Sequence, residues 1–271
     1  ALKAMITSLH SPHVEAVKAL LGSRGGKARK ESGQYVIEGF SSIKEALDFS
    51  PEEITTLYLT SDGMSRLATI PEGYFEIVEV SREVMKAMTD TVTPQGLLAI
   101  AQIPENSFAD FLASSKSELK IAYFWQIQDP GNAGTVIRAA DAFGFDAVIF
   151  SDNSVDIYSP KVVRSSAGSH WHIPLFTSIS EDQLKSQIAG RAFDVYATDT
   201  NGGLELLEAA NESKDRSAIW IFGNEARGLG AKVVSILGAK QVAIPISGKA
   251  ESLNLATAAS VVMYAVSTAR K

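Results

Sequence analysis

Three separated segments in the C-terminal half of the chain each join the end of an apolar strand to a polar turn. They cover residues 128–138, 221–229 and 244–256. Each turn is rich in Gly, Asn or Pro, and each delivers Asn, Arg, Glu or Ser side chains. Open α/β folds bind their ligands at the carboxyl ends of parallel strands. The three segments therefore predict one site at the carboxyl edge of a parallel sheet.

Apolar strands alternate with amphipathic helices over most of the sequence. The first hundred residues follow this pattern, and it resumes at residue 121. Between the two stretches, residues 104–119 are polar and rich in Ser, with a short helical pattern. Such alternation favours an α/β fold with helices on the faces of a parallel sheet. We expect a small N-terminal α/β domain over residues 1–105, a linker over 106–118 and a parallel-sheet domain over 119–271.

Composition excludes several kinds of chemistry. The 271 residues include no Cys, so disulfides, thiolate catalysis and Cys-based metal sites are excluded. The first residues are too polar for a signal peptide, and no apolar run reaches about 18 residues, so we expect a cytoplasmic protein without a membrane segment. His170 and His172 would share one side of a strand, but no carboxylate or Cys stands near them at ligand spacing, so no metal site is predicted. Motifs of a Rossmann dinucleotide site or a P-loop are missing as well.

The charge balance bears on nucleic-acid binding. A formal net charge of −6 weakens that interpretation, because phosphate binding usually leaves a basic footprint. A local patch is enough, however, and the strongest one lies at residues 24–30. Two glycines in it suggest a mobile loop, and its candidate RNA-binding cations are Arg24, Lys27, Arg29 and Lys30. A solvated loop without a partner explains the same residues equally well.

The first of the three segments leads into a predicted helix over residues 132–143. The first turn of a helix can hold an anion on its free backbone N–H groups. Arg138 lies about two turns into this helix, on an edge that could reach the same ligand. Alternatively, Asn132 only caps the helix and Arg138 is an ordinary surface charge.

The second and third segments also allow two interpretations each. Glu225 stands directly after an apolar strand, where a carboxylate is unfavourable unless it has a partner such as Arg138, Arg227 or a ligand hydroxyl. Alternatively, Asn224 and Glu225 cap the next helix. The last helix opens at residues 252–254 and is rich in Ala, which lets another backbone approach closely. An N-cap on a well-packed helix is the simpler interpretation there.

Taken together, the three segments resemble the motifs of the SpoU (TrmH-like) branch of the SPOUT RNA 2′-O-methyltransferases. The motifs occur in order and at family-like spacing over residues 119–271. Residues 10–102 are similar, more loosely, to the ribosomal-protein-like substrate-binding domain of that family. In chain order, the matching residues are Asn132 and Arg138, then Gly223-Asn224-Glu225 with Gly228, then Ile244-Pro245 and Ser252-Leu253-Asn254.

The resemblance implies a fold and a cofactor. The C-terminal domain would be tied in a deep trefoil knot, which is very rare among proteins. The protein would be a homodimer, with the first motif near the interface. S-adenosylmethionine would bind against the knot loops. The residues expected to bind this cofactor are Thr198, Asp199, Thr200, Asn201, Gly223, Asn224, Ile244, Ser252 and Leu253.

The implied reaction moves a methyl group from a sulfonium to a ribose 2′-hydroxyl, which must be made nucleophilic and aligned. Arg138 occupies the catalytic position of the family. Because a guanidinium stays protonated, we expect Arg138 to hold the adjacent phosphate and stabilise the developing alkoxide. Glu225 would orient Arg138 or accept the proton through water. Asn132, Ser252 and Asn254 would position the ribose and the loop backbone.

The sequence therefore predicts an S-adenosylmethionine-dependent methyltransferase that acts on structured RNA. Arg164 lies in residues 160–168, which resemble family members acting on ribosomal RNA, so we expect Arg164 to bind RNA phosphate. This favours 23S ribosomal RNA over transfer RNA as the substrate. Two other classes stay open: a non-catalytic RNA-binding or ribosome-assembly factor on the same fold, and a small-molecule α/β enzyme, which would suit the acidic charge.

Overall fold

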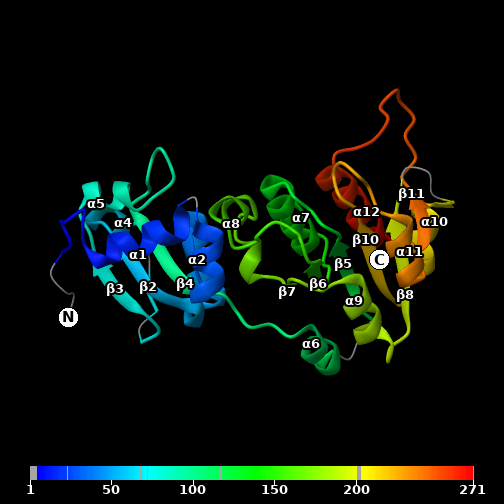
Figure 1. Ribbon diagram of the computed structural model, residues 1–271, viewed down its shortest axis with the longest axis horizontal. Helices are drawn as coiled ribbons and strands as arrows, with labels where there is room; N and C mark the ends of the chain where they lie inside the picture. Colours follow the sequence, from blue (N-terminus) through cyan, green and yellow to red (C-terminus); the bar gives the residue numbers. More distant parts are fainter. Residues whose placement is uncertain are drawn as a thin grey trace. The chain divides into compact units, whose positions relative to one another are not determined.

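The computed structural model describes residues 5–22, 24–67, 69–71, 73–115, 118–199 and 203–270. Its chain forms two compact units (Figure 1). The first contains Ala1–Glu105 and Asp156–His172, and the second contains Asn106–Val155 and Ile173–Lys271.

A four-stranded mixed sheet forms the centre of the first unit, with the strand order β1-β4-β2-β3. Strand β4 runs antiparallel to β1 and β2, whereas β3 is parallel to β2. The strands are β1 (Gln34–Glu38), β2 (Ile54–Leu59), β3 (Glu76–Glu79) and β4 (Leu97–Gln102). The helices are α1 (Pro12–Leu21), α2 (Gly25–Ser32), α3 (Phe40–Phe49), α4 (Ser61–Met64), α5 (Arg82–Ala87) and α8 (Pro160–Ser165), with 3₁₀ turns at Pro51–Glu53 and Ser169–Trp171.

The segment Asp156–His172 folds with the first unit because its side chains bond there. Arg29 Nε donates to Asp156 Oδ2 at 2.8 Å, and Trp171 Nε1 donates to the Tyr35 hydroxyl at 3.2 Å. The sequence-based division had assigned this segment to the domain over 119–271. The bonded residues stand 127 and 136 positions apart, so no local pattern could reveal the pairing.

A seven-stranded parallel sheet forms the centre of the second unit, in the order β7-β6-β5-β10-β8-β11-β9. Every pair of neighbours is parallel, which confirms the expected parallel sheet. The strands are β5 (Lys120–Phe124), β6 (Ala147–Phe150), β7 (Leu175–Phe176), β8 (Phe193–Thr198), β9 (Leu204–Glu205), β10 (Ser217–Phe222) and β11 (Lys240–Ala243). The helices are α6 (Phe108–Ser114), α7 (Pro130–Ala142), α9 (Glu181–Ile188), α10 (Leu206–Ser213), α11 (Ala231–Leu237) and α12 (Leu255–Ala269).

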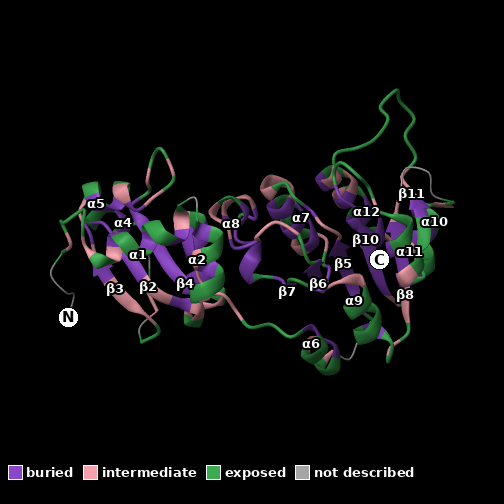
Figure 2. Cartoon of the chain, viewed as in Figure 1, coloured by how far each residue is buried: buried purple, intermediate pink, exposed green. Residues whose placement is uncertain are grey.

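The second unit buries both faces of its sheet (Figure 2). Ile121 and Tyr123 of β5 belong to one apolar cluster with residues of α6, α9 and α11. Because strand side chains alternate between faces, Ala122 and Phe124 point to the opposite face, and Phe124 stacks on Phe222 with ring centroids 4.8 Å apart. Helix α12 packs against α7 and α10, and its buried small side chains permit the close approach.

The stretch expected to be a linker carries α6. Phe108 and Leu112 of this helix are buried in the core of the second unit, and the Phe108 ring lies 5.2 Å from that of Phe176. Residues 106–115 are therefore part of that unit's packing. In the part of the chain that the structure describes, no helix is both long and apolar enough to cross a membrane.

Candidate active site

The three sequence segments meet at the carboxyl edge of the parallel sheet, as expected. Strand β5 leads into the turn before α7, β10 leads into residues 223–229, and the chain after β11 leads to the start of α12. Strands β5 and β10 are neighbours in the sheet, so their following turns lie side by side. Parallel strands place all of these polar turns at one edge.

Glu225 joins the first two segments. Its carboxylate accepts backbone N–H groups of Gln128 at 3.2 Å and Asp129 at 3.1 Å, and the side-chain amide of Asn132 at 3.4 Å. The expected cationic partner is absent: within the described residues, no ion pair links Glu225 to Arg138 or Arg227. Backbone donors satisfy the carboxylate instead, so Glu225 fixes the turn that opens α7.

Asn132 extends this network to the third segment. Asn254 Nδ2 donates to Asn132 Oδ1 at 3.3 Å, while Asn254 Oδ1 accepts the N–H groups of Ala256 and Thr257 at the start of α12. Helix α7 is capped by Asp129, whose Oδ1 accepts the Asn132 N–H at 2.7 Å. The Asn132 side chain is therefore not the cap, and it forms one chain with Glu225 and Asn254.

Asn224 is the buried anchor of the second segment, with 7% of its surface exposed. Its Nδ2 donates to the Gln126 carbonyl at 2.7 Å, and its Oδ1 accepts the N–H groups of Ala226 and Arg227. A Cβ on the preceding Gly223 would overlap the backbone of Gly228, so this position requires glycine. The turn after β10 is therefore fixed by the Asn224 hydrogen bonds and by the close approach of Gly223 to Gly228.

Gln126 is a member of the site that the sequence did not indicate. Its backbone has a positive φ of 52°, which is uncommon outside glycine. Its Oε1 accepts the guanidinium of Arg227 at 2.9 Å. It stands at the end of an apolar run, where only the three-dimensional structure reveals its role.

Arg138 lies on the exposed side of α7. Within the described part of the chain, its guanidinium makes no hydrogen bond or ion pair. An arginine in this state keeps all of its donors available for a ligand.

A cavity of about 460 Å³ opens beside this network. Of the residues expected to bind a cofactor, Thr198, Asp199, Gly223, Asn224, Ile244, Ser252 and Leu253 line it. Thr200 and Asn201 lie outside the described residues. Six further lining residues complete the wall besides Glu225: Arg227, Gly228, Leu229, Ile246, Leu255 and Ala258. All of these except Ala258 already lie within the segments 221–229 and 244–256, which the sequence had singled out.

The cavity suits a nucleoside-type cofactor in size and chemistry. Its volume falls within the usual range for small-molecule sites. Ile246 and Leu253 are 37% and 38% exposed, so their apolar surfaces are available to cover a ligand. Asp199 and Glu225 place carboxylates on the cavity wall, which favours a ligand with a cationic group. These groups fit the adenosyl and sulfonium parts of S-adenosylmethionine.

The basic segment of the first unit differs from the expected loop. Residues 25–32 form helix α2, and Arg24 at its N-cap, Lys27 and Lys30 are exposed. Arg29 is 6% exposed, and its guanidinium donates to Asp156 and to the Leu20 carbonyl. The expectation that Arg29 binds RNA is therefore wrong, because its donors stabilise the fold.

Arg164 is held by an ion pair. Its Nη1 lies 2.7 Å from Glu38 Oε2, and 35% of the Arg164 side chain stays exposed. His170 and His172 lie at a 3₁₀ turn and not on a strand, and they bond to separate partners. Among the described residues, no cluster of His, Asp and Glu is arranged to hold a metal ion.

Comparison with known proteins gives a consistent picture. Residues 120–264 match the model of the SpoU rRNA Methylase family, and residues 12–99 match the MRM3-like substrate binding domain. The 23S rRNA (guanosine(2553)-2'-O)-methyltransferase RlmP of Bacillus subtilis is 32% identical, over 88% of this chain and 90% of its own length. The 23S rRNA (uridine(2479)-2'-O)-methyltransferase of Streptomyces viridochromogenes is 27% identical, over 91% and 86%.

Solved structures agree with the sequence relatives. The AdoMet-bound rRNA methyltransferase of Sinorhizobium meliloti superposes with a TM-score of 0.84 at 27% identity, covering 97% of this chain and 96% of its own. The family model covers more than half of this chain, including every residue of the Asn132–Glu225–Asn254 network. The chain belongs to the SpoU rRNA methylase family.

Proposed function

We propose that the protein methylates a ribose 2′-hydroxyl of 23S ribosomal RNA, with S-adenosylmethionine as the methyl donor. The observation that carries the proposal is the bonded Asn132–Glu225–Asn254 chain beside a cofactor-sized cavity, with the unpaired Arg138 on the same helix as Asn132. The relatives named above act on 23S rRNA, which supports ribosomal over transfer RNA.

The cofactor supplies an activated methyl group, so the protein's own residues must prepare the RNA hydroxyl. Arg138 stays protonated at neutral pH and cannot be the base. It binds the phosphate next to the target ribose and stabilises the negative charge that develops on the 2′-oxygen. Bidentate guanidinium–phosphate contacts also fix the orientation of the ribose.

Glu225 acts by positioning. Its carboxylate already accepts three N–H groups, so it holds Asn132 and the turn before α7 in place. Asn132 and Asn254 present their remaining amide atoms to the ribose, and Ser252 lines the cavity. The proton of the 2′-hydroxyl leaves to solvent. Glu225 supplies the carboxylate of the Asn132–Glu225–Asn254 network.

The test is methyl transfer from labelled S-adenosylmethionine to full-length 23S rRNA and to bulk transfer RNA, followed by mapping of the modified ribose. We expect Arg138→Ala to lower the rate by about 100-fold or more, as loss of a charge-stabilising group does. Arg216→Ala, an exposed arginine of the same unit paired with Asp194, is the matched control. Equal activity of Arg138→Ala and the wild-type protein would exclude this role.

We also propose a homodimer, a trefoil knot and a cytoplasmic location, which follow from family membership. For the dimer, α12 exposes Val261 and Tyr264, and the Tyr264 ring lies 5.8 Å from that of Phe143. An aromatic surface of this kind next to the first motif is a suitable contact face. Sedimentation of the wild-type protein and Tyr264→Asp tests it: a monomeric wild-type protein contradicts the proposal.

A further inference from the structure

Among the described residues that line the candidate active-site cavity, Arg227 is the only cation. The wall also carries two carboxylates, those of Asp199 and Glu225, and its other side chains are neutral. Within the described part of the chain, Arg138 is not one of the lining residues. A single cation on the wall of a cavity of this size favours a ligand with one anionic group.

The turn after β10 holds the backbone of Arg227 in place. Asn224 and Gly228 close this turn with two backbone hydrogen bonds, of 2.9 and 2.8 Å. The Arg227 N–H donates to the Oδ1 atom of the buried Asn224 at 3.1 Å. The exposed Arg227 side chain therefore starts from a fixed point, and only its own rotatable bonds are free.

Gln126 fixes the guanidinium end of the same side chain. Its Oε1 accepts Arg227 Nη2 at 2.9 Å. The Gln126 backbone is itself held, because its N–H donates to Ser151 Oγ at 2.7 Å and its carbonyl accepts Asn224 Nδ2 at 2.7 Å. These bonds keep residue 126 at a positive φ of 52°. Such a conformation is uncommon outside glycine, and where the surroundings maintain it, it often belongs to a binding site.

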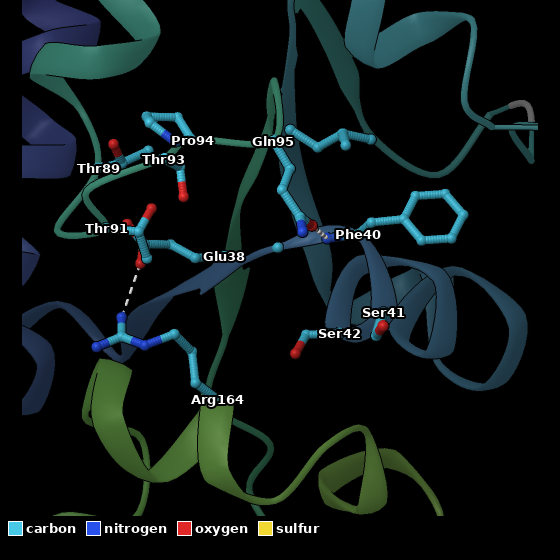
Figure 3. A pocket seen from close by; sticks show the side chains of 12 residues that line it. Glu38, Phe40, Ser41, Ser42, Thr89, Thr91, Thr93, Pro94, Gln95 and Arg164 are labelled. Atoms are coloured by element: carbon cyan, nitrogen blue, oxygen red, sulfur yellow. Dashed lines mark hydrogen bonds and ion pairs between the residues drawn. The ribbon is translucent and has the colours of Figure 1, made fainter.

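The partner of the Arg227 guanidinium carries no charge. An amide oxygen orients a guanidinium without neutralising it, and Arg227 makes no ion pair among the described residues. Arg164 of the first unit is different, because the Glu38 carboxylate lies 2.7 Å from it and offsets its charge (Figure 3). Arg227 therefore keeps a full positive charge, together with the donors on Nε and Nη1.

S-adenosylmethionine has one anionic group, the α-carboxylate of its methionine part. A guanidinium matches a carboxylate with two parallel N–H···O bonds, which are stronger than hydrogen bonds between neutral groups. A guanidinium that is already oriented also loses less entropy when it binds. The carboxylates of Asp199 and Glu225 repel an anion elsewhere on the wall, so Arg227 is the position that favours it.

We propose that Arg227 binds the α-carboxylate of S-adenosylmethionine and that Gln126 positions the Arg227 guanidinium. This inference rests on the proposed function for the identity of the methyl donor. Because the product S-adenosylhomocysteine has the same carboxylate, the contact strengthens the binding of substrate and product alike and leaves the barrier to methyl transfer unchanged. Adenosine derivatives without the carboxylate gain nothing from it, so Arg227 determines which of them the cavity selects.

The test compares two ligands that differ in their amino-acid part. S-adenosylhomocysteine has the α-carboxylate, whereas methylthioadenosine has only the nucleoside and the thioether. Calorimetric titration of the protein without RNA measures both affinities. Arg227→Gln removes the charge, and Arg227→Lys keeps the charge but not the planar pair of donors. Arg216→Gln, at an exposed arginine of the same unit, is the matched control.

We expect Arg227→Gln to lower the affinity for S-adenosylhomocysteine about tenfold or more and Arg227→Lys to lower it about threefold, as loss of hydrogen bonds between charged groups does. The affinity for methylthioadenosine should change by less than about twofold. In methyl transfer, Arg227→Gln should raise the KM for S-adenosylmethionine by a similar factor and leave kcat within about twofold of wild type. Arg216→Gln should match the wild-type protein in each measurement.

Gln126→Glu tests the positioning role separately. The new carboxylate keeps an acceptor for Arg227 Nη2, so the melting temperature should be maintained. It also neutralises the guanidinium and repels the carboxylate of the ligand. We therefore expect the affinity for S-adenosylhomocysteine to fall about tenfold, while that for methylthioadenosine stays within about twofold. If Gln126 served only the structure of the turn, the binding of both ligands would be unchanged.

The outcomes separate this inference from the proposed function. The titrations involve neither RNA nor methyl transfer. A protein that transfers no methyl group to 23S rRNA, but shows the ligand-specific loss in Arg227→Gln, contradicts the proposed function and supports the inference. Equal losses for both ligands, no loss for S-adenosylhomocysteine, or a wild-type protein that binds neither ligand overturns it. A loss of RNA affinity in Arg227→Gln with unchanged cofactor affinity also overturns it and assigns Arg227 to an RNA phosphate.

Discussion

Glu225 is the residue whose role the structure defines most closely. Its carboxylate accepts two backbone N–H groups and the Asn132 amide, and its side chain is exposed. Glu225→Gln replaces one oxygen with an amide donor, which must then face an N–H group. We expect a rate of methyl transfer about 10- to 100-fold lower, because a small displacement of a group that positions the substrate strongly reduces the reaction rate.

Thermal unfolding serves as the control for Glu225→Gln. Because the side chain is exposed, the melting temperature should change little. A large drop in melting temperature with a proportional loss of folded protein would show that Glu225 serves stability and not positioning. Normal activity would contradict the assigned role altogether.

His170 gives the first unit a pH dependence. Burial lowers its pKa to about 4, and its Nε2 lies 2.8 Å from the Ile157 carbonyl, so the neutral ring carries its proton on Nε2. The unfolded state, with a pKa near 6.5, binds more protons between pH 4 and 6.5. The His170 contribution to stability is therefore complete above about pH 6.5 and is lost as the pH falls towards 4, by roughly 3 kcal/mol.

Urea unfolding of the wild-type protein and His170→Gln at several pH values measures this effect. The comparison is necessary because Glu53, whose pKa burial raises to about 7, has the opposite trend between pH 4.5 and 7. The difference between the two proteins should shrink as the pH falls below 6.5. A difference that is independent of pH would show that His170 is not held neutral.

The location of a site residue could be predicted where that residue directly follows a strand in the sequence. Asn132, Glu225 and Asn254 stand at strand ends or helix starts, so the sequence could predict that they share one edge. Their bonding could not be predicted, since the Glu225 partners are mainly backbone groups that no sequence pattern identifies. Arg29 was misassigned for a related reason: its partner Asp156 is distant in sequence and belongs to a segment expected in another domain.

The turn after β10 is the element on which the cofactor cavity depends. Gly223→Ala would force its Cβ against the backbone of Gly228 and Leu229, which cannot move without displacing the Asn224 contacts. We expect S-adenosylmethionine affinity to fall at least tenfold, measured by calorimetric titration. Gly230→Ala is the matched control, because its Cβ would meet nothing within 4 Å and its φ of −67° suits alanine.

Most elements were predictable because their apolar periodicity is local. The helix predicted over residues 132–143 agrees with α7 within a few residues. Helix α2 was expected to be a loop because its glycines and cations carry no apolar stripe. It forms because Gly25, which has no Cβ, can lie close to the Leu20 carbonyl oxygen. The Arg29 guanidinium also donates a hydrogen bond to that carbonyl.

At the scale of the whole molecule, each unit contains a cavity of its own. The cavity with Ser41, Ser42 and Arg164 lies in the first unit, and the cavity with Gly223 and Leu253 lies in the second. The chain crosses between the units more than once, because Asp156–His172 returns to the first. Periodicity along the sequence could not reveal this return, which depends on contacts between distant residues.

The last prediction concerns how the two units act together. The exposed Lys30, a candidate RNA contact, belongs to the first unit and Gly223 to the second, so substitutions in each should have independent effects on catalysis. We expect Lys30→Gln to raise the KM for RNA and Gly223→Ala to raise the KM for S-adenosylmethionine. In the double variant, with both substrates below saturation, the losses in rate should multiply to within about twofold, which corresponds to the usual additivity of distant sites. Steady-state methyl transfer by the wild-type protein, the two single variants and the double variant measures the coupling. A departure of tenfold or more would mean that RNA binding in the first unit changes the cofactor site in the second, and the two units would then have to be treated as one cooperative site.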